Sequence, residues 1–324
     1  MVWQKSPLWH KSPFAHRVVG NAALRAVDAA GEIAGTVGGI FERQPQYQDV
    51  GDAEMAYWRI GSGPALVFVH GWPLSSATWV KLVPIFSEHF TCVVIDQAGA
   101  GQTRTSPDTD YNFRGQARRL NAFLDALGDP TVHVLAQNTG ATIARAAALQ
   151  AGSRIASLVL TNTEIPGHRP PYIEMFQTVT KLPGAARVFQ QLLRSRTFVR
   201  SAMGFGGCFT DKSLLDGDFR QRIIEPLVRS RRRVEGINRY LWGIDWGIVD
   251  GLAIGHTRLD VPVLFVWGED DPTFPIEQAR PMAAQLPDCR GFQAVPGASL
   301  LVYEERATVV AEHALAFYRE LGAI

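Results

Sequence analysis

The stretch Thr131-Val-His-Val-Leu-Ala-Gln-Asn138-Thr-Gly-Ala-Thr-Ile-Ala-Arg145 decides the fold of this chain. Its β-branched and apolar first half predicts a strand, and the small residues of its second half predict a helix. Only a sharp turn at Asn138 joins the two, and such an elbow can mount a nucleophile at the edge of a sheet. Ser, Cys or Asp is the residue type expected at the apex. Asn138 carries a neutral amide, which is a poor nucleophile.

Strands and helices alternate on both sides of this stretch. Apolar runs predict further strands at Met55–Ile60, Ala65–His70, Thr91–Asp96, Ser157–Asn162, Val261–Gly268 and Gly291–Val295. Helices are predicted at Thr78–His89 with a kink near Pro84, at Phe113–Leu127, and from Glu304 to about Leu321. The glycines of Gly61-Ser-Gly63-Pro64 predict a hairpin-like break between the first two of these strands. Because the strands are continuously apolar, we expect an α/β fold whose parallel sheet is covered on both faces.

The alternation stops in the middle of the chain, which divides it into four segments. Residues 165–255 contain several helical patterns and no convincing strand. We therefore expect a helical cap, inserted after the sixth strand of the α/β domain. The predicted organisation is an N-terminal extension (1–45), the first part of the core (46–164), the cap (165–255) and the second part of the core (256–324).

The composition is that of an ordinary globular domain. Of the 324 residues, 46% are hydrophobic and 19% are charged, so the chain can bury a full core. The net charge of +1 gives no field that would attract nucleic acid. The three cysteines have no metal or redox spacing, and their odd number suits a reducing compartment. We expect a cytoplasmic protein with neither a metal nor a cofactor.

Residues 18–40 have the pattern of an amphipathic helix. Apolar residues recur there every three or four positions, and charged residues interleave with them. The charges exclude a signal peptide, and the segment is too polar for a transmembrane segment. It can pack on the body of the protein, form a homodimer contact or lie on a membrane surface, and the sequence leaves these three open.

Three loops carry a resemblance to a known family. His70-Gly71-Trp72-Pro73, the elbow at Asn138 and Gly268-Glu-Asp-Asp271-Pro272 each follow a predicted strand. In this order they resemble an α/β-hydrolase with a cap, in the branch with an aspartate nucleophile that includes epoxide hydrolases and haloalkane or haloacetate dehalogenases. The resemblance covers about residues 47–321. It implies a mostly parallel eight-stranded sheet with helices on both faces.

The resemblance also implies roles for individual positions. In such enzymes a carboxylate attacks carbon, a histidine oriented by an acid activates water, and backbone N–H groups hold the ester oxygen. These N–H groups correspond to Trp72 and Thr139, and the acid corresponds to Asp271. The nucleophile position holds Asn138 and the base position holds Leu300, which cannot accept a proton. Standard hydrolysis is therefore expected to be lost or very weak.

A pocket for a small apolar molecule is expected beneath the cap. By the resemblance, two cap tyrosines can protonate a substrate oxygen, and aromatic side chains can line the pocket. The residues expected there are Trp72, Tyr172, Phe176, Tyr240, Trp242 and Trp246. Glu164 is expected to have a structural role against His168 or Arg169. Asp271, left without a histidine, is expected to be solvated or satisfied by backbone N–H groups, a hydroxyl or an arginine.

Asn138 itself allows three interpretations. Asparagine tolerates the positive φ of an elbow, so it can simply fit the turn. Its amide can bind a ligand oxygen or water, or it can deamidate to an aspartate. The chain as a whole is then an impaired hydrolase, a receptor-like binding protein, or an isomerase, lyase or cyclase that uses Tyr172, Tyr240 or Asp271.

Overall fold

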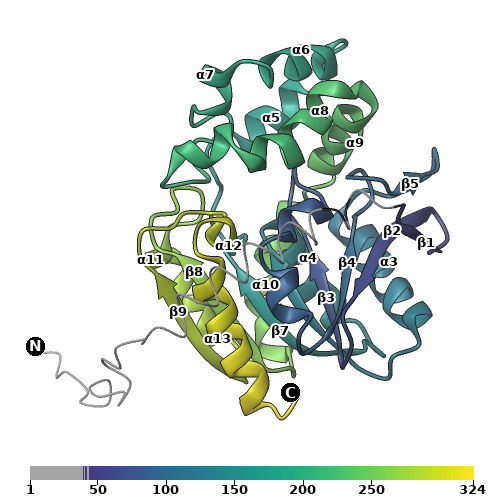
Figure 1. Cartoon of the computed structure of the whole chain (residues 1–324), viewed down its shortest axis with the longest axis vertical. Helices are drawn as coiled ribbons and strands as arrows, with labels where there is room; N and C mark the ends of the chain where they lie inside the picture. Colours follow the sequence, from purple (N-terminus) through teal and green to yellow (C-terminus); the bar gives the residue numbers. More distant parts are fainter. Residues whose placement is uncertain (1–38, 40, 42–43) are drawn as a thin grey trace, which may run out of the picture.

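A nine-stranded sheet runs through the centre of the computed structural model, which describes residues 39, 41 and 44–324 (Figure 1). Eight strands follow one another across the sheet in the order β1-β2-β4-β3-β6-β7-β8-β9. Pairing is parallel from β4 to β9, whereas β2 runs antiparallel to its neighbours. The strands are β1 (Gln46–Asp49), β2 (Ala53–Ile60), β3 (Ala65–Val69), β4 (Thr91–Ile95), β5 (Arg104–Thr105), β6 (Val132–Gln137), β7 (Ile155–Thr161), β8 (Val263–Gly268) and β9 (Cys289–Val295).

Two predictions about the sheet need correction. The ninth strand is the two-residue β5, which pairs with β2 and is too short to give an apolar pattern. The break at Gly61–Gly63 is not a hairpin, because β2 pairs with β4 and not with β3. Both glycines have positive φ, and a Cβ on either would lie within 2.5 Å of a backbone oxygen of the Ser87–Phe90 turn. They let the chain pass this turn closely.

Helices cover both faces of the sheet, as the continuous apolar strands predict. Successive side chains of β3 enter different cores: Phe68 packs with α2 (Val83–Phe86) and α13 (Ala307–Glu320), and Val67 packs with α3 (Phe113–Leu127) and α4 (Thr139–Ala148). The bounds of α3 are those predicted. Its first turn is capped by the Asn112 side chain, which accepts from the N–H of Gly115.

Two predicted helices are divided in the structure. The segment predicted as one kinked helix forms a 3₁₀ turn, Ser76–Trp79, followed by α2, with Pro84 in its first turn. The last predicted helix divides into α12 (Val302–Glu305) and α13, because Arg306 leaves helical geometry at φ −137°. The smaller helices in the second part of the core are η4 (His256–Arg258), α11 (Ile276–Ala279) and η5 (Arg280–Gln285).

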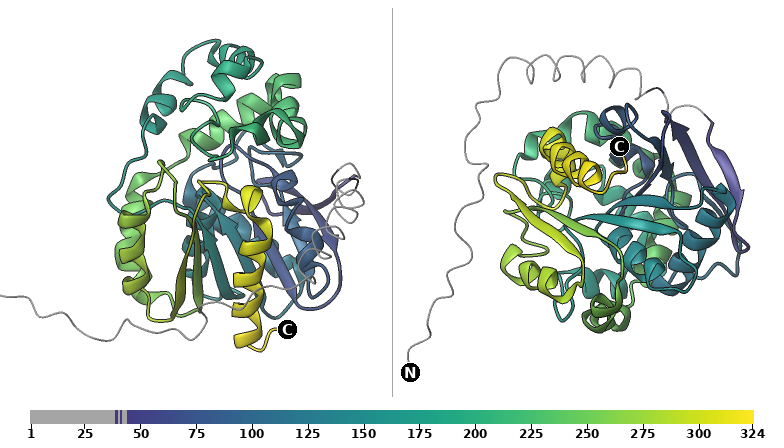
Figure 2. Two further views of the ribbon diagram at one scale, coloured as in Figure 1. Left: turned by 60° about the vertical axis from the view of Figure 1, so that its left-hand side comes forward. Right: turned by 90° about the horizontal axis from the view of Figure 1, so that it is seen from below.

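A layer of helices covers the carboxyl ends of the parallel strands (Figures 1 and 2). It follows β7, which is the sixth strand in chain order once the short β5 is set aside. At its end, α10 packs against α4 and so returns to the α/β core. The helices of this segment are α5 (Ile173–Val179), α6 (Ala185–Leu192), α7 (Arg196–Val199), η2 (Lys212–Asp216), η3 (Arg220–Ile224), α8 (Glu225–Arg229), α9 (Arg231–Trp242) and α10 (Trp246–Gly255).

The structure says nothing of the helix predicted at residues 18–40, which lies outside the described residues. In the part of the chain that is described, no helix has the length and apolar character to cross a membrane.

Candidate functional site

Asn138 occupies the apex of a sharp turn between β6 and α4. Its backbone has φ 50° and ψ −133°, in the region that asparagine tolerates better than most residues. Glycine is needed at two positions around the turn, one in α4 and one in the loop after β3. A Cβ on Gly140 would lie 2.4 Å from the carbonyl oxygen of His70, and one on Gly71 would lie 2.5 Å from the Cβ of Asn138. The small residues that predict this elbow therefore allow β3, the turn and α4 to approach one another.

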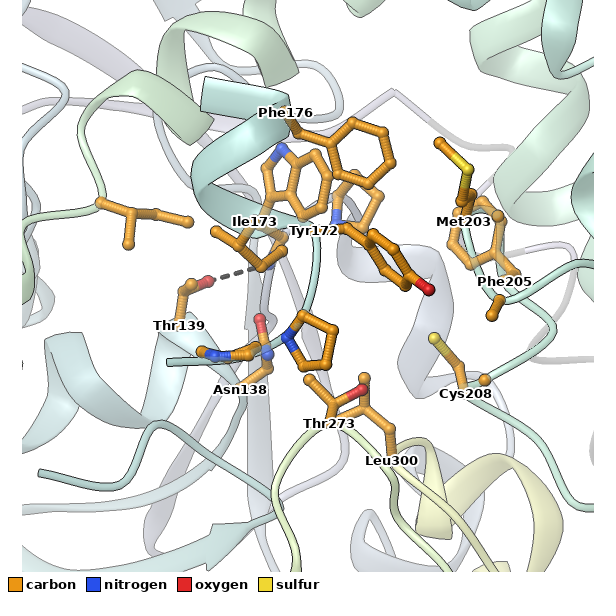
Figure 3. Close-up of a pocket in the computed structure, with 18 of the residues that line it drawn as sticks. Asn138, Thr139, Tyr172, Ile173, Phe176, Met203, Phe205, Cys208, Thr273 and Leu300 are labelled. Atoms are coloured by element: carbon orange, nitrogen blue, oxygen red, sulfur yellow. Dashed lines mark hydrogen bonds between the residues drawn. The ribbon is translucent and has the colours of Figure 1, made fainter. Parts of the chain in front are cut away.

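A cavity of about 110 Å³ lies between the elbow and the cap (Figure 3). Asn138, Thr139 and Leu300 line it from the core, and Tyr172, Phe176 and Met203 line it from the cap. Most of the remaining lining is apolar, and it comprises Trp72, Pro73, Glu164, Pro170, Pro171, Ile173, Phe189, Leu193, Ala202, Gly204, Phe205, Gly207, Cys208, Ile244, Trp246, Thr273 and Phe274. The volume and the apolar walls suit a small organic molecule.

Asn138 and Leu300 both line this cavity. Leu300 is 7% exposed and belongs to the hydrophobic core, so its side chain closes the wall opposite the cap. The Asn138 amide is also 7% exposed, and none of the described residues hydrogen-bonds to it. It can offer a donor and an acceptor to a molecule in the cavity.

Four of the six side chains expected around the ligand line the cavity, namely Trp72, Tyr172, Phe176 and Trp246. Tyr240 and Trp242 do not. Both lie on α9 two residues apart, a spacing that points side chains in different directions. Tyr240 is fully buried beneath Thr139, whereas Trp242 is 39% exposed and donates its indole N–H to Thr180 at 2.8 Å.

The Trp72 N–H, expected to hold a substrate oxygen, already has a partner within the protein. It donates to the hydroxyl oxygen of Thr139 at 2.8 Å, the bond drawn as a dashed line in Figure 3. That hydroxyl also bonds the Tyr240 hydroxyl at 2.9 Å, which accepts from the amide of Gln97 at 3.0 Å. Burial raises the pKa of Tyr240, so it remains a neutral hydroxyl. The N–H of Thr139 begins α4, where such groups have no intrahelical acceptor.

Asp271 is buried at the end of β8 and does not line the cavity. One carboxylate oxygen accepts from the Asn162 amide at 2.8 Å, and the other accepts from the N–H of Thr273 at 2.7 Å. The expected backbone N–H donor is therefore present, and the Asn162 amide was not anticipated. Burial raises the pKa of Asp271 to about 7, against the lowering effect of these bonds.

A buried polar network lies behind the elbow. The guanidinium of Arg145 on α4 donates to the hydroxyls of Thr142 and Thr163 and to the carbonyl oxygen of Glu164. The Glu164 carboxylate accepts from both hydroxyls, at 2.7 and 3.0 Å. Burial raises the pKa of Glu164 and lowers that of Arg145 to about 10.

The expected partners of Glu164 lie elsewhere. The ring of His168 bonds the carbonyl oxygen of Thr273 at 2.8 Å, and Arg169 pairs with Asp250 at 2.6 Å. A sequence pattern could not reveal these Glu164 partners, because Thr142 and Arg145 lie about twenty positions earlier in the chain, on the elbow helix.

His256 is the next member of this network and contacts Arg145. Its Nε2 lies 3.1 Å from Arg145, which can only donate, so Nε2 accepts and the proton sits on Nδ1. Nδ1–H then donates to the Gln285 side chain at 2.7 Å. Burial and the neighbouring Arg145 lower the pKa of His256 to about 4. This histidine is a neutral structural group and does not line the cavity.

Cys208 is an ionisable cavity residue that the sequence pattern did not predict. It had no spacing signal, yet its thiol lines the wall near Leu300 (Figure 3). Burial raises its pKa, and the nearby carboxylates of Asp271 and Glu305 add to the effect. The group is therefore a thiol and not a thiolate at neutral pH, which makes it a weak nucleophile.

The described residues hold no cluster of His, Cys, Asp or Glu that could bind a metal ion. Among the described lining residues of the cavity there is also no histidine. The ionisable side chains that reach the cavity are Glu164, Tyr172 and Cys208.

Comparison with known proteins gives a consistent result. Residues 64–306 match a family model described as the alpha/beta hydrolase fold. A haloalkane dehalogenase from Mesorhizobium japonicum is 29% identical over 265 residues, which is 77% of this chain and 83% of that protein. Haloalkane dehalogenase 2 from Mycobacterium tuberculosis is 24% identical over 252 residues, or 77% and 86% of the two chains. A ligand-free epoxide hydrolase structure superposes with a TM-score of 0.70 at 21% identity and covers 86% of this chain and 99% of that one.

Proposed function

Because this chain belongs to the alpha/beta hydrolase fold family, we propose a function that keeps the family's binding pocket but not its usual reaction. The chain is related to dehalogenases and epoxide hydrolases. It binds a small, mainly apolar molecule under its cap and does not hydrolyse that molecule through a covalent intermediate. One observation carries the proposal. Asn138 and Leu300, which the family resemblance assigns to the positions of the nucleophile and the base, both line the cavity.

The chemistry of these two groups explains the expected loss of turnover. A neutral amide does not form the ester that a carboxylate forms, and leucine cannot accept a proton from water. Loss of one member of a catalytic unit already costs several powers of ten in rate, and losses within the unit are not additive. Together the two residues leave the cavity wall neutral at both positions, and the buried acid that then lacks a cation, Asp271, is held by Asn162 and Thr273 instead.

The polar groups of the cavity indicate which kind of molecule fits. The Asn138 amide lacks a partner among the described residues, and the N–H of Thr139 lies beside it at the start of α4. The rest of the lining is mostly apolar. The ligand we propose is therefore apolar over most of its surface and carries an oxygen atom that accepts from these two groups.

Binding and turnover can be tested separately on the same protein. Binding is measured by the fluorescence of Trp72 and Trp246, which line the cavity, with epoxides, haloalkanes and esters as probes. The products of each incubation are identified as well. We expect saturable quenching without product formation, and the Asn138→Leu variant should weaken binding of oxygen-bearing probes more than of plain haloalkanes. Steady product formation by the unmodified protein would contradict the proposal, provided that mass spectrometry finds no aspartate at position 138.

A double variant, Asn138→Asp with Leu300→His, tests how far the cavity retains a hydrolase geometry. Recovered epoxide or haloalkane turnover would mean that the two side chains alone account for the loss. A double variant that binds the probes but stays inactive would mean that the surrounding site has also changed, as the occupied Trp72 N–H suggests.

Glu164 favours one second candidate, an enzyme with acid–base chemistry. It is the carboxyl group found among the described lining residues, and burial raises its pKa. A raised pKa makes the carboxyl easier to protonate, and its protonated form can donate a proton to a bound molecule. Product formation that disappears in Glu164→Gln, and persists in Asp271→Asn, would favour this candidate over simple binding.

A further inference from the structure

Two cap helices lack the burial that normally stabilises a helix. Among the α-helices in the described part of the chain, α5 and α6 are the ones with no fully buried residue. Both nevertheless carry many apolar side chains, and those of α6 gather on one face. A helix with this pattern needs an apolar surface beside it.

Large exposed hydrophobic side chains concentrate on these helices and their connections. Of the nine that the described residues contain, seven lie between Tyr172 and Met203. Six of them line one open groove of about 410 Å³, and Leu182 and Val188 are 62% and 60% exposed. We call these six the cap patch: Met175, Val179, Leu182, Val188, Leu192 and Met203. A contiguous apolar surface of this kind marks a contact with another molecule or a membrane.

Positive charges surround the cap patch. Residues 171–200 contain five basic side chains and one acidic side chain, Glu174, which lies 3.9 Å from Arg169. Asp216 pairs with two of the five, Arg196 and Arg200. The other three, Lys181, Arg187 and Arg194, are exposed and make no ion pair with any described residue. The patch thus combines apolar side chains with three unpaired cations.

This combination matches the interface of a lipid bilayer. An amphipathic helix in the plane of a membrane buries its apolar side chains below the headgroups, and its lysines and arginines contact anionic headgroups. Helix α6, which carries Val188 and Leu192 of the patch, lies at the outer end of the cap, at the opposite end of the molecule from the C-terminus (Figure 1). A flat surface can therefore reach it without meeting the α/β core.

A second copy of the chain fits the patch less well. In a twofold contact the same surface faces itself, so the three unpaired cations of each copy would approach those of the other. Like charges brought together at an interface disfavour the contact. An anionic surface has the complementary sign.

We propose that the cap patch docks the protein on a membrane surface rich in anionic phospholipids. The contact rests on the exposed residues alone and does not depend on what the cavity binds. Phe176, Phe189 and Met203 line both the groove and the cavity, so a docked cap would set the cavity beside the hydrocarbon layer.

Sedimentation of the full-length protein with vesicles tests the proposal. The vesicles are phosphatidylcholine alone and phosphatidylcholine mixed with phosphatidylglycerol. We expect binding to the anionic vesicles that weakens as salt is added. Each basic residue near an anionic surface strengthens binding about fivefold, so Lys181→Gln/Arg187→Gln/Arg194→Gln should lower the partition coefficient roughly 100-fold. Leu182→Asp/Val188→Asp should abolish insertion.

Matched controls come from the other side of the chain. Ile254 on α10 is 68% exposed and Arg258 follows it closely, so Ile254→Asp and Arg258→Gln repeat the chemical changes away from the patch. Both should bind like the unmodified protein, and circular dichroism checks that every variant is folded.

Absence of vesicle binding would overturn the proposal. Equal binding by patch and control variants would do so too, because residues 18–40 or another surface would then carry the contact. A dimer that Leu182→Asp/Val188→Asp dissociates, without vesicle binding, would assign the patch to a second copy instead.

Discussion

The backbone N–H of Trp72 and the hydroxyl of Thr139 are joined by a hydrogen bond of 2.8 Å across the floor of the cavity. Thr139 is the first residue of α4, and by the family resemblance the two residues correspond to the positions where a hydrolase of this fold holds a developing negative charge. A donor in that place is typically worth about 10²–10³ in rate. Here the donor is engaged before any ligand arrives, so a ligand must compete with Thr139 for it.

Replacing Thr139 tests how much this bond contributes to stability. In Thr139→Ala the Trp72 N–H loses its acceptor and the buried Tyr240 hydroxyl loses a partner. We expect the free energy of unfolding to fall by about 1–3 kcal/mol, measured by urea denaturation. Thr139→Ser keeps the hydroxyl and should retain most of the stability. Equal losses in the two variants would mean that the methyl group, and not the hydrogen bonds, stabilises this position.

Asp271 should make the protein less stable as the pH rises. Its pKa is raised from 3.8 to about 7 in the folded chain, so between these values the folded state holds a proton that the unfolded state has released. Stability present below pH 3.8 is therefore lost as the pH approaches 7, by roughly 4 kcal/mol in full. Asp271→Asn removes this titration. We expect its stability deficit relative to the unmodified protein to shrink over this window, as followed by urea midpoints at a series of pH values. A constant deficit would refute the raised pKa.

The sequence predicted the parts of the structure that local patterns determine. The elbow at Asn138, the parallel strands and the bounds of α3 follow from runs of β-branched, small or periodic apolar residues. Leu300 could be placed by counting back from Glu304, because this loop is short and follows a strand. These features depend on residues close together in the chain.

Contacts that join distant segments could not be predicted in this way. Tyr240 and Thr139 are 101 positions apart, and which side of α9 faces the core depends on how the cap packs. The same limit explains why Tyr240 and Trp242 were both expected in the cavity and why Cys208 was not. The prediction of a hairpin at Gly61–Gly63 was wrong for a related reason, since β4 comes later in the chain and takes the place beside β2.

His256 should affect stability in the direction opposite to Asp271. Its pKa falls from 6.5 to about 4 on folding, so between these values the unfolded state binds a proton that the folded state rejects. Stability then rises with pH across this window, by roughly 3 kcal/mol in full. The main cause is burial of the ring, and the Arg145 guanidinium, which faces Nε2 and would oppose a proton there, adds to it.

The variant His256→Asn isolates this effect, since asparagine can keep an acceptor for Arg145 but does not titrate. Its stability, compared with that of the unmodified protein by urea denaturation, should show a smaller rise between pH 4 and pH 6.5. In parallel, nuclear magnetic resonance of the His256 ring should find it neutral at pH 6. A ring that titrates near pH 6.5 would contradict the proposed tautomer and its bond to Arg145.

Cys208 should report on whether the cavity is occupied. Its raised pKa keeps it a thiol near neutral pH, so we expect iodoacetamide to modify it much more slowly than a free cysteine, and faster at alkaline pH. A probe bound in the cavity should slow the reaction further, because Cys208 lines the wall that the probe would cover. Cys289 is the internal control: its pKa is also raised by burial, but it does not line the cavity, so the probe should leave its rate unchanged. Peptide mapping by mass spectrometry follows both sites in one sample. Equal slowing at Cys208 and Cys289 would indicate general stabilisation of the fold, and no slowing at Cys208 would place the bound probe outside the cavity.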